Sequence, residues 1–322
     1  MGEVVKSSVL EIESIDLEYA GLKKGSLKGE VAVITGGASN VGLGFARAIA
    51  WAGAQVVISD INEETGNEAE RVINEENAPN TALFVKCDIT SEADVKNLAK
   101  KAFAKFGKVD ILVNNAMNMD LSGLILKTPV SDLEKAFAIS GKGVMLAIKE
   151  FVPGMIERKH GTVTYSATQF HYCPPLIGGP LYCAGKAAAT SIVMSLANEV
   201  KDTGVNVFCI TPAGVGRTAP PRTPPWLIGT EDTPKAPPAR KPNPGFDGRI
   251  SPEASGAAMV YCILNAEKLH GSGIGIYDAF NAMKYPYPRP ETVTAANSRR
   301  LNDFELTLVL SNMGQGFAGN ED

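Results

Sequence analysis

The chain has 322 residues, 44% of them hydrophobic, which is enough for one substantial core. Its formal net charge of −4 gives no electrostatic reason to expect nucleic acid as a partner. No apolar run reaches the roughly 18 residues that a membrane-spanning helix needs, and the N-terminus lacks the apolar stretch of a signal peptide, so no membrane partner is expected.

The cysteines and histidines favour a cytoplasmic protein without a metal centre. Five cysteines are scattered along the chain, none in a C-x-x-C pair, which is typical of reduced thiols. The three histidines are His160, His171 and His270, and none has a metal-ligating partner at helical or loop spacing.

Short apolar runs alternate with helical stretches from residue 30 onward. The first run, Val31 to Ile34, is continuously apolar, as expected of a parallel strand with both faces covered. The predicted strands are 31–34, 55–59, 82–87, 109–113, 161–166, 206–211 and 273–277, and the predicted helices are 42–53, 63–77, 91–106, 131–158, 180–203 and 252–266. Alternation at this spacing indicates βαβ units, so we expect an α/β fold: a Rossmann-like, doubly wound parallel sheet with helices on both faces.

One domain, residues 29–283, is expected between two ends of different character. Residues 1–28 are interpreted as an N-terminal arm and residues 284–322 as a C-terminal tail, and both are expected to reach neighbouring subunits. Within the domain, residues 219–248 hold nine of the 20 prolines, which favours an extended substrate loop over periodic structure. Trp226 belongs to the apolar cluster of that loop, which we expect to cap the substrate.

A glycine-rich segment, residues 35–42, lies between the first strand and the first helix. Glycines there let the backbone approach a pyrophosphate at the helix N-terminus, which binds anions through its free N–H groups. Asp60 ends the second strand, where an acid accepts hydrogen bonds from the adenosine ribose. Such an acid repels a 2′-phosphate, and no Arg or Lys lies within several residues, so NAD is favoured over NADP. A simple helix-starting turn is the alternative interpretation of Asp60.

Tyr182 and Lys186 are four residues apart and share one face of the helix predicted over 180–203. A phenol, with a pKa of about 10, is a poor base at neutral pH, but a neighbouring ammonium lowers that pKa. The phenol then accepts the proton of an alcohol during oxidation, or donates one during ketone reduction. The alternative is an exposed aromatic and an exposed lysine at ordinary helical spacing.

These segments together resemble the short-chain dehydrogenase/reductase family, whose motifs include T-G-x-x-x-G-x-G, N-N-A-G and Y-x-x-x-K. The resemblance covers residues 29–283 and implies an oxidoreductase in which Tyr182 exchanges the proton and Lys186 also binds the nicotinamide ribose. It implies a cofactor-binding set of Gly36, Ser39, Asn40, Val41, Gly42, Asp60, Asp88, Ile89, Asn115, Ala116, Tyr182, Lys186, Pro212 and Val215.

Several positions depart from the family pattern. Asn40 replaces the second glycine of the glycine motif, where asparagine tolerates a left-handed backbone. Met117 replaces the glycine after N-N-A and adds bulk near the expected nicotinamide pocket. Ser140 replaces the asparagine that holds a water for proton relay, and it is assigned here to the catalytic group.

The family's catalytic serine has no counterpart at the usual spacing, because Gln169 lies 13 residues before Tyr182. Counting from Gly161, where the fifth strand begins, places Thr168 at the serine position. Thr168 is preferred, while Ser166, on the same strand face, and Gln169 stay open. The residues expected to border the substrate are Gln169, His171 and Trp226.

The sequence therefore predicts an NAD(H)-dependent oxidoreductase that interconverts a secondary alcohol and a ketone, on a mostly apolar or cyclic small molecule. One alternative is a catalytically impaired dinucleotide-binding subunit of a larger assembly, motivated by the altered positions 40, 117, 140 and 168. Another is a C=C reductase on the same scaffold. The resemblance also implies a homodimer or homotetramer.

Overall fold

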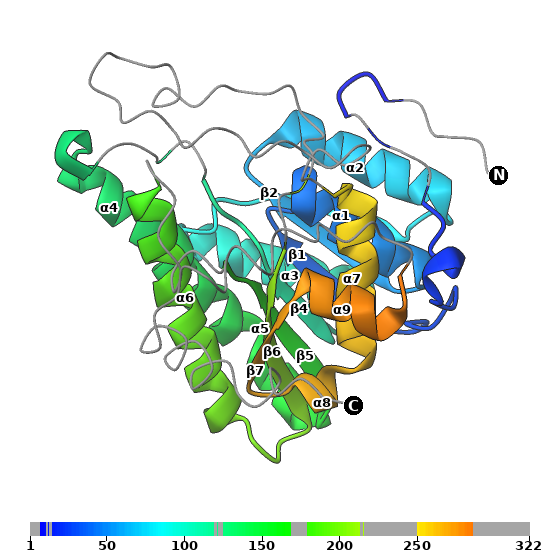
Figure 1. Cartoon of the computed structure of the whole chain (residues 1–322). Helices are drawn as coiled ribbons and strands as arrows, with labels where there is room; N and C mark the ends of the chain where they lie inside the picture. The colour runs from blue at the N-terminus through cyan, green and yellow to red at the C-terminus, as the bar shows by residue number, and fades with distance from the viewer. Residues whose placement is uncertain are drawn as a thin grey trace, which may run out of the picture.

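A seven-stranded parallel sheet forms the centre of the protein, in the strand order β3-β2-β1-β4-β5-β6-β7 (Figure 1). The computed structural model describes residues 7–10, 12, 15–118, 121, 125–168, 179–212, 215 and 250–285. The strands are β1 (Val31–Thr35), β2 (Gln55–Asp60), β3 (Ala82–Lys86), β4 (Ile111–Asn114), β5 (Gly161–Ser166), β6 (Val205–Thr211) and β7 (Ser272–Gly275). The predicted Rossmann-like, doubly wound sheet is confirmed.

Helices cover both faces of this sheet and produce three layers (Figure 1). One core lies between the sheet and α1 (Asn40–Trp51), α2 (Glu63–Glu76), α7 (Pro252–Leu264), α8 (Ala266–Leu269) and α9 (Ile276–Met283). The other lies between the sheet and α3 (Glu92–Phe106), α5 (Val144–Arg158) and α6 (Pro180–Glu199). The unbroken apolar run of β1 follows from this arrangement, because Ala32 and Ile34 belong to the first core while Val31 and Val33 belong to the second. Among the described residues, no helix is both long enough and apolar enough to cross a membrane.

The helix predicted over 131–158 is present, but it is not α-helical throughout. The segment divides into α4 (Val130–Phe137), a π-helical turn η3 (Ala138–Gly143) and α5. The turn contains Gly141 and Gly143, whose low helix propensity makes a departure from α-helical hydrogen bonding less costly. Ser140 lies within it and is 1% exposed.

The end of the domain also differs from the prediction, which extended a strand to Tyr277. β7 stops at Gly275, and the next residues form α9. The backbone N–H of Gly275 donates to the Asp278 carboxylate at 3.2 Å, which caps the start of that helix. The helix predicted over 252–266 likewise divides into α7 and α8.

The described part of the N-terminal arm packs on the core of its own chain. Leu17, which precedes the 3₁₀ turn η1 (Glu18–Ala20), is 1% exposed, and Leu22 and Leu27 join the same core. The hydroxyls of Tyr19 and Tyr285 are 2.5 Å apart, so the arm meets the residue that follows α9 and Lys284. The expectation that the arm and tail reach neighbouring subunits stays a prediction.

A buried ionic cluster joins α1, α2 and α7 on the same side of the sheet. Arg47 of α1 is fully buried, donates through Nε to Glu76 at 3.0 Å, and also pairs with Glu253 of α7. Close backbone packing accompanies the cluster, because a Cβ on Gly44 would lie 2.0 Å from the Pro252 carbonyl oxygen. Helix α1, which follows the glycine-rich segment, is therefore fixed by residues more than 200 positions later in the chain.

Candidate active site

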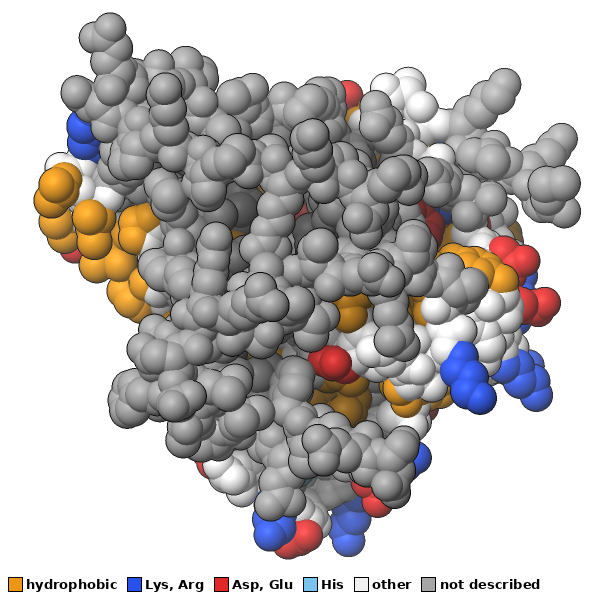
Figure 2. All heavy atoms as spheres, viewed as in Figure 1, with side chains coloured by type: hydrophobic (Ala, Val, Ile, Leu, Met, Phe, Trp, Pro, Cys, Tyr) orange, Lys and Arg blue, Asp and Glu red, His pale blue; other side chains and the backbone are white. Residues whose placement is uncertain are grey.

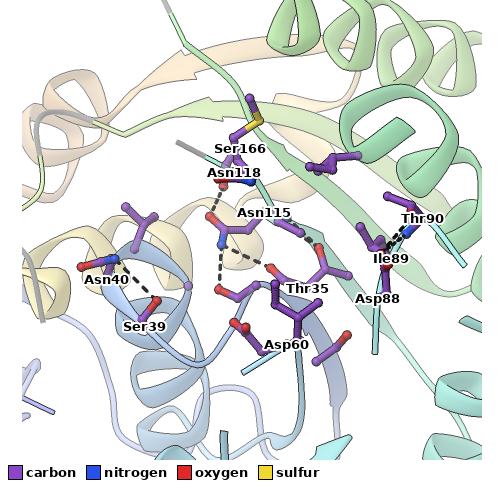
Figure 3. A pocket seen from close by; sticks show the side chains of 18 of the residues that line it. Thr35, Ser39, Asn40, Asp60, Asp88, Ile89, Thr90, Asn115, Asn118 and Ser166 are labelled. Carbon is purple, nitrogen blue, oxygen red and sulfur yellow. Dashed lines mark hydrogen bonds between the residues drawn. The ribbon is translucent and has the colours of Figure 1, made fainter. Parts of the chain in front are cut away.

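The glycine-rich segment connects β1 to α1 at the edge of the sheet where β1, β4 and β5 end (Figure 3). Gly36 has a φ of 63° and Asn40 a φ of 46°, so both adopt the left-handed conformation that asparagine was expected to tolerate at position 40. A Cβ on Gly42 would lie 2.0 Å from the Gly36 carbonyl oxygen, which leaves no room for a larger residue. The turn is therefore tightly folded against the N-terminus of α1.

Asn115 ties this turn to the ends of β1 and β5 (Figure 3). Its side-chain amide donates to the carbonyl oxygens of Thr35 at 3.2 Å and Gly36 at 3.1 Å, and its Oδ1 accepts from Ser166 Oγ at 3.0 Å. Thr35 Oγ1 accepts from the backbone N–H groups of Asn115 and Ala116. One side chain thus fixes three strand ends relative to each other.

A cavity of about 630 Å³ opens along this edge. Most of the predicted cofactor-binding residues line it: Gly36, Ser39, Asn40, Val41, Gly42, Asp60, Asp88, Ile89, Asn115, Ala116, Tyr182, Lys186 and Pro212. Val215 does not line it and forms an isolated bridge with Ile250. The structure therefore brings together residues that are spread over more than 170 positions of sequence.

Two carboxylates lie along the cavity between β2 and α3. Asp60 accepts from the backbone N–H of Ala38 at 3.2 Å through one oxygen and from that of Asn62 at 3.1 Å through the other. Asp88 accepts from the backbone and hydroxyl of Thr90 at 2.9 and 2.8 Å through a single oxygen. Both carboxylates are thus held in place by neighbouring backbone groups before any ligand arrives.

The predicted acid/base pair lies at the other end of the cavity. Tyr182 hydrogen-bonds with Thr168, the preferred candidate for the missing serine, which is 4% exposed, and that assignment stays a prediction. Ser166 lines the cavity, whereas Thr168 does not. Lys186 donates to the Ser166 carbonyl oxygen at 2.5 Å, and its Nζ is 5.8 Å from the centroid of the Tyr182 ring.

The pKa of Tyr182 differs in direction from the sequence-based expectation. Burial raises the pKa of this phenol, and the hydrogen bond with Thr168 opposes that shift. Burial also lowers the pKa of Lys186 to about 7, because the ammonium is removed from water. Lys186 therefore gains or loses its proton near pH 7 and is not permanently charged.

We expect this lysine to make stability depend on pH. Between about pH 7 and the ordinary lysine value of 10.5, the unfolded chain binds a proton that the folded protein lacks, so the free energy of unfolding rises with pH. Lys186→Met removes that contribution. In urea unfolding, the free energy of unfolding of Lys186→Met should exceed that of wild type by the largest amount below pH 7. The difference between the two proteins should shrink toward pH 10. A difference that is constant with pH would contradict the assignment.

Ser140 lies behind the cavity wall rather than on it. Its hydroxyl donates to the thioether of Met117 at 3.4 Å, and Met117 rather than Ser140 lines the cavity. The predicted catalytic role of Ser140 stays a prediction. The candidate substrate residues Gln169, His171 and Trp226, with residues 219–248, lie outside the described residues.

Sequence reasoning missed part of the cavity wall. Lys135, Ala138 and Ile139 line it, as do Cys87, Thr90 and Leu121. The first three are spaced like one face of a helix, but only the packing of α4 beside the sheet shows which face turns inward. Cys87 and Thr90 flank Asp88 and Ile89, so their place could have been inferred from the strand end.

The comparisons with known proteins agree with this geometry. A family model described as short chain dehydrogenase matches residues 30–222. A protein of Melia azedarach named (21S)-21-acetoxyl-apo-melianone synthase is 35% identical over 192 residues, which are 59% of this chain and 68% of that relative.

Two solved structures share the fold. One is a 3-ketoacyl-(acyl-carrier-protein) reductase from Brucella melitensis complexed with NADH, 26% identical, with a TM-score of 0.63 over 78% of this chain and 97% of that one. The other is an L-sorbose reductase from Gluconobacter frateurii complexed with NADPH and L-sorbose, 25% identical, with a TM-score of 0.67 over 79% of this chain and 97% of that one. Both reductases hold a nicotinamide cofactor.

Proposed function

Because this chain belongs to the short-chain dehydrogenase family, a family of oxidoreductases, we propose that it is an NAD(H)-dependent enzyme interconverting a secondary alcohol and a ketone. One observation carries the proposal: Tyr182, hydrogen-bonded with Thr168, and Lys186 line the same cavity as the glycine turn and Asp60. A phenol that has a hydroxyl partner and a neighbouring ammonium can exchange a proton with a carbonyl oxygen. Nothing in folding alone demands that these groups share a cavity.

The residues present fit a dinucleotide. The turn between Gly36 and Gly42 is so closely packed that a Cβ on Gly42 would meet backbone atoms, and it lies at the N-terminus of α1, where unsatisfied N–H groups favour a pyrophosphate. Asp60 would hold the adenosine ribose, and Asp88 with Ile89 would hold the adenine. When bound, the nicotinamide supplies or accepts the hydride.

The tightness of this turn can be tested by Gly42→Ala. A methyl group 2.0 Å from the Gly36 oxygen must displace the turn, at a cost of about 1–3 kcal/mol. We expect NADH binding, followed by fluorescence titration, to weaken by roughly tenfold to a hundredfold. Gly154→Ala in α5 is the matched control, since its Cβ would meet only the tip of the Arg158 side chain, and it should leave binding unchanged. Equal NADH affinity in Gly42→Ala and Gly154→Ala would exclude a contribution of the Gly36–Gly42 turn to cofactor binding.

The preference for NAD over NADP rests on Asp60. Both of its oxygens accept backbone N–H groups, so the carboxylate is held in the cavity, where its negative charge would repel a 2′-phosphate bound beside it. The basic residues among the described cavity wall are Lys135 and Lys186. Lys135 pairs with Asp132 at 2.7 Å, and neither lysine adjoins Asp60 in sequence. Asp60→Ala should therefore narrow the difference between NADH and NADPH affinity.

In ketone reduction, the Tyr182 hydroxyl gives its proton to the carbonyl oxygen as the hydride reaches the carbonyl carbon. In alcohol oxidation the same oxygen takes that proton back. Thr168 donates a hydrogen bond that stabilises the phenolate between these steps, consistent with its effect on the phenol pKa. Lys186, when charged, stabilises the same phenolate electrostatically.

A mostly apolar or cyclic substrate is supported by the wall near Tyr182. Met117, Leu121 and Ile139 line the cavity, and Leu121 and Ile139 pack with Leu181, the residue before Tyr182. Such a wall offers contact area but few hydrogen-bonding groups.

The test is a panel of cyclic secondary alcohols and ketones with NADH and NADPH, followed by nicotinamide absorbance. Turnover of at least one substrate, faster with NAD(H), is the expected result. Tight NADH binding without turnover of any alcohol or ketone would instead favour the dinucleotide-binding subunit. The position of Ser140 behind Met117 is the observation that keeps that second candidate in view.

We also propose that the protein acts in the cytoplasm as a homodimer or homotetramer. The described cysteines Cys87, Cys209 and Cys262 are free and buried, which suits a reducing compartment. Exposed apolar side chains gather over α4 and the 3₁₀ turn η2 (Ile125–Lys127), at the left of Figure 2. Leu126 there is 95% exposed, and such a patch is typical of a contact surface.

A further inference from the structure

Lys186 has an aromatic neighbour that the motifs do not specify. Its Nζ lies 4.8 Å from the centroid of the Tyr165 ring, closer than to the ring of Tyr182. Tyr165 comes from β5, one residue before Ser166, whose carbonyl oxygen accepts a hydrogen bond from the same ammonium. The charged end of Lys186 therefore lies over a strand residue that is itself 1% exposed.

Tyr165 also contacts the π-helical turn. Its hydroxyl hydrogen-bonds with Ser140, whose own hydroxyl donates to the Met117 thioether. Ser140 in turn packs against α6, because a Cβ on Gly185 would lie 2.8 Å from Ser140 Oγ. Ser140 and Met117, two positions where the sequence departs from its family, thus belong to one connected group with Tyr165.

We propose that Tyr165 is a positioning residue for the proton-exchange step: its ring face holds the Lys186 ammonium, and its hydroxyl holds the turn that carries Ser140. This inference rests on the proposed function, because it gives Tyr165 a task only where Lys186 serves a nicotinamide site. The negative face of an aromatic ring attracts a desolvated cation strongly. A buried ammonium without that face would lose its proton more readily.

The neighbours of this ammonium are few in the described part of the chain. The titratable groups that face it are the phenols of Tyr165 and Tyr182 and the thiol of Cys209, which pairs with Tyr165 across β5 and β6. Burial raises the pKa of that thiol to about 12 and raises that of Tyr165 as well, so both stay neutral over the range of the test. Of the two phenol rings, that of Tyr165 lies closer to the charged lysine, and it acts beside the Ser166 carbonyl oxygen that accepts the hydrogen bond from Lys186.

The experiment compares four forms of the full chain with wild type. Tyr165→Phe keeps the ring and removes the hydroxyl. Tyr165→pentafluorophenylalanine also lacks the hydroxyl, keeps a ring of similar shape and reverses the negative charge of its face, and Tyr165→Leu removes the ring. Phe151→Leu is the matched control, since Phe151 is a buried aromatic of the same core that contacts Phe103 rather than Lys186. NADH affinity and the free energy of unfolding without cofactor are measured from about pH 5 to about pH 10.

We expect NADH binding in wild type to weaken above about pH 7, as Lys186 loses its proton. That limb should move about one pH unit lower, a roughly tenfold change, in the pentafluorophenylalanine and Leu forms, and stay in place in Tyr165→Phe and Phe151→Leu. The rise of unfolding free energy with pH should move in the same direction. A limb at the same pH in all five proteins would overturn the proposal.

The pentafluorophenylalanine form decides the matter if Tyr165→Leu does not fold. If no substrate reacts, the proposed function fails, and NADH affinity still tests the positioning role. If NADH does not bind, the pH dependence of unfolding tests it alone. An equal shift in Phe151→Leu and Tyr165→Leu would show a structural effect only and would overturn the proposal.

Discussion

Tyr182→Phe is expected to lower turnover by about 10²- to 10⁴-fold, the usual contribution of a positioned acid or base. The change removes a single oxygen and keeps the ring that packs between α6 and the cavity. Proton exchange with the substrate oxygen then has to proceed through water. Hydride transfer itself is not removed, so the loss should be large but finite.

The measurement is steady-state turnover of the best substrate in the panel, with NADH affinity determined in parallel. NADH affinity should fall far less than turnover, because Tyr182→Phe changes one member of the predicted cofactor-binding set and leaves the glycine turn and Asp60 untouched. Tyr261→Phe, on α7 and outside the residues that line the cavity, serves as the control and should turn over normally. Wild-type turnover by Tyr182→Phe would assign the proton to another group.

Arg47→Met is expected to destabilise the fold by about 3–5 kcal/mol, the cost of leaving a buried charge without its partner. Arg47 holds Glu76 and Glu253, whose side chains are 10% and 8% exposed, so both carboxylates would remain in a poorly hydrated space. Urea unfolding should show a lower midpoint with an unchanged slope.

Arg71→Met is a matched control for that measurement. Arg71 also pairs with two glutamates, Glu68 at 2.8 Å and Glu75 at 2.6 Å, but its side chain is 41% exposed. Exposed pairs contribute about 0–1 kcal/mol, so the control should lose little. Similar losses in the two variants would mean that burial of the Arg47 cluster has no energetic consequence.

Local sequence was sufficient to predict the structural features that depend on a short segment of chain. Short, continuously apolar runs predicted the strands, because the central strands of the sheet are buried on both faces. The left-handed backbone at Asn40 and the shared face of Tyr182 and Lys186 also follow from local chemistry. The cavity then follows from topology, since parallel strands bring their carboxyl ends to one edge.

The features that depend on packing between separate elements could not be predicted from the sequence. In the π-helical turn, Ser140 packs against Gly185 of α6, a contact between elements far apart in the sequence. The sign of the Tyr182 pKa shift depends on burial, which outweighs the expected influence of Lys186. The contact between Lys186 and Tyr165 joins a helix to a strand and leaves no periodic trace. Such features arise only when the separate elements pack together in the folded protein.

The bonds from Arg47 to Glu253 and the packing of Gly44 on Pro252 have a consequence for how the protein is made. A nascent polypeptide emerging from the ribosome contains the whole nucleotide-binding turn long before it contains α7. Until that late helix leaves the exit tunnel, Arg47 has only one of its two carboxylates and the backbone of α1 lacks its neighbour. A chain that terminates before residue 253 therefore carries every cofactor motif but lacks the contacts with α7 that fix the position of α1.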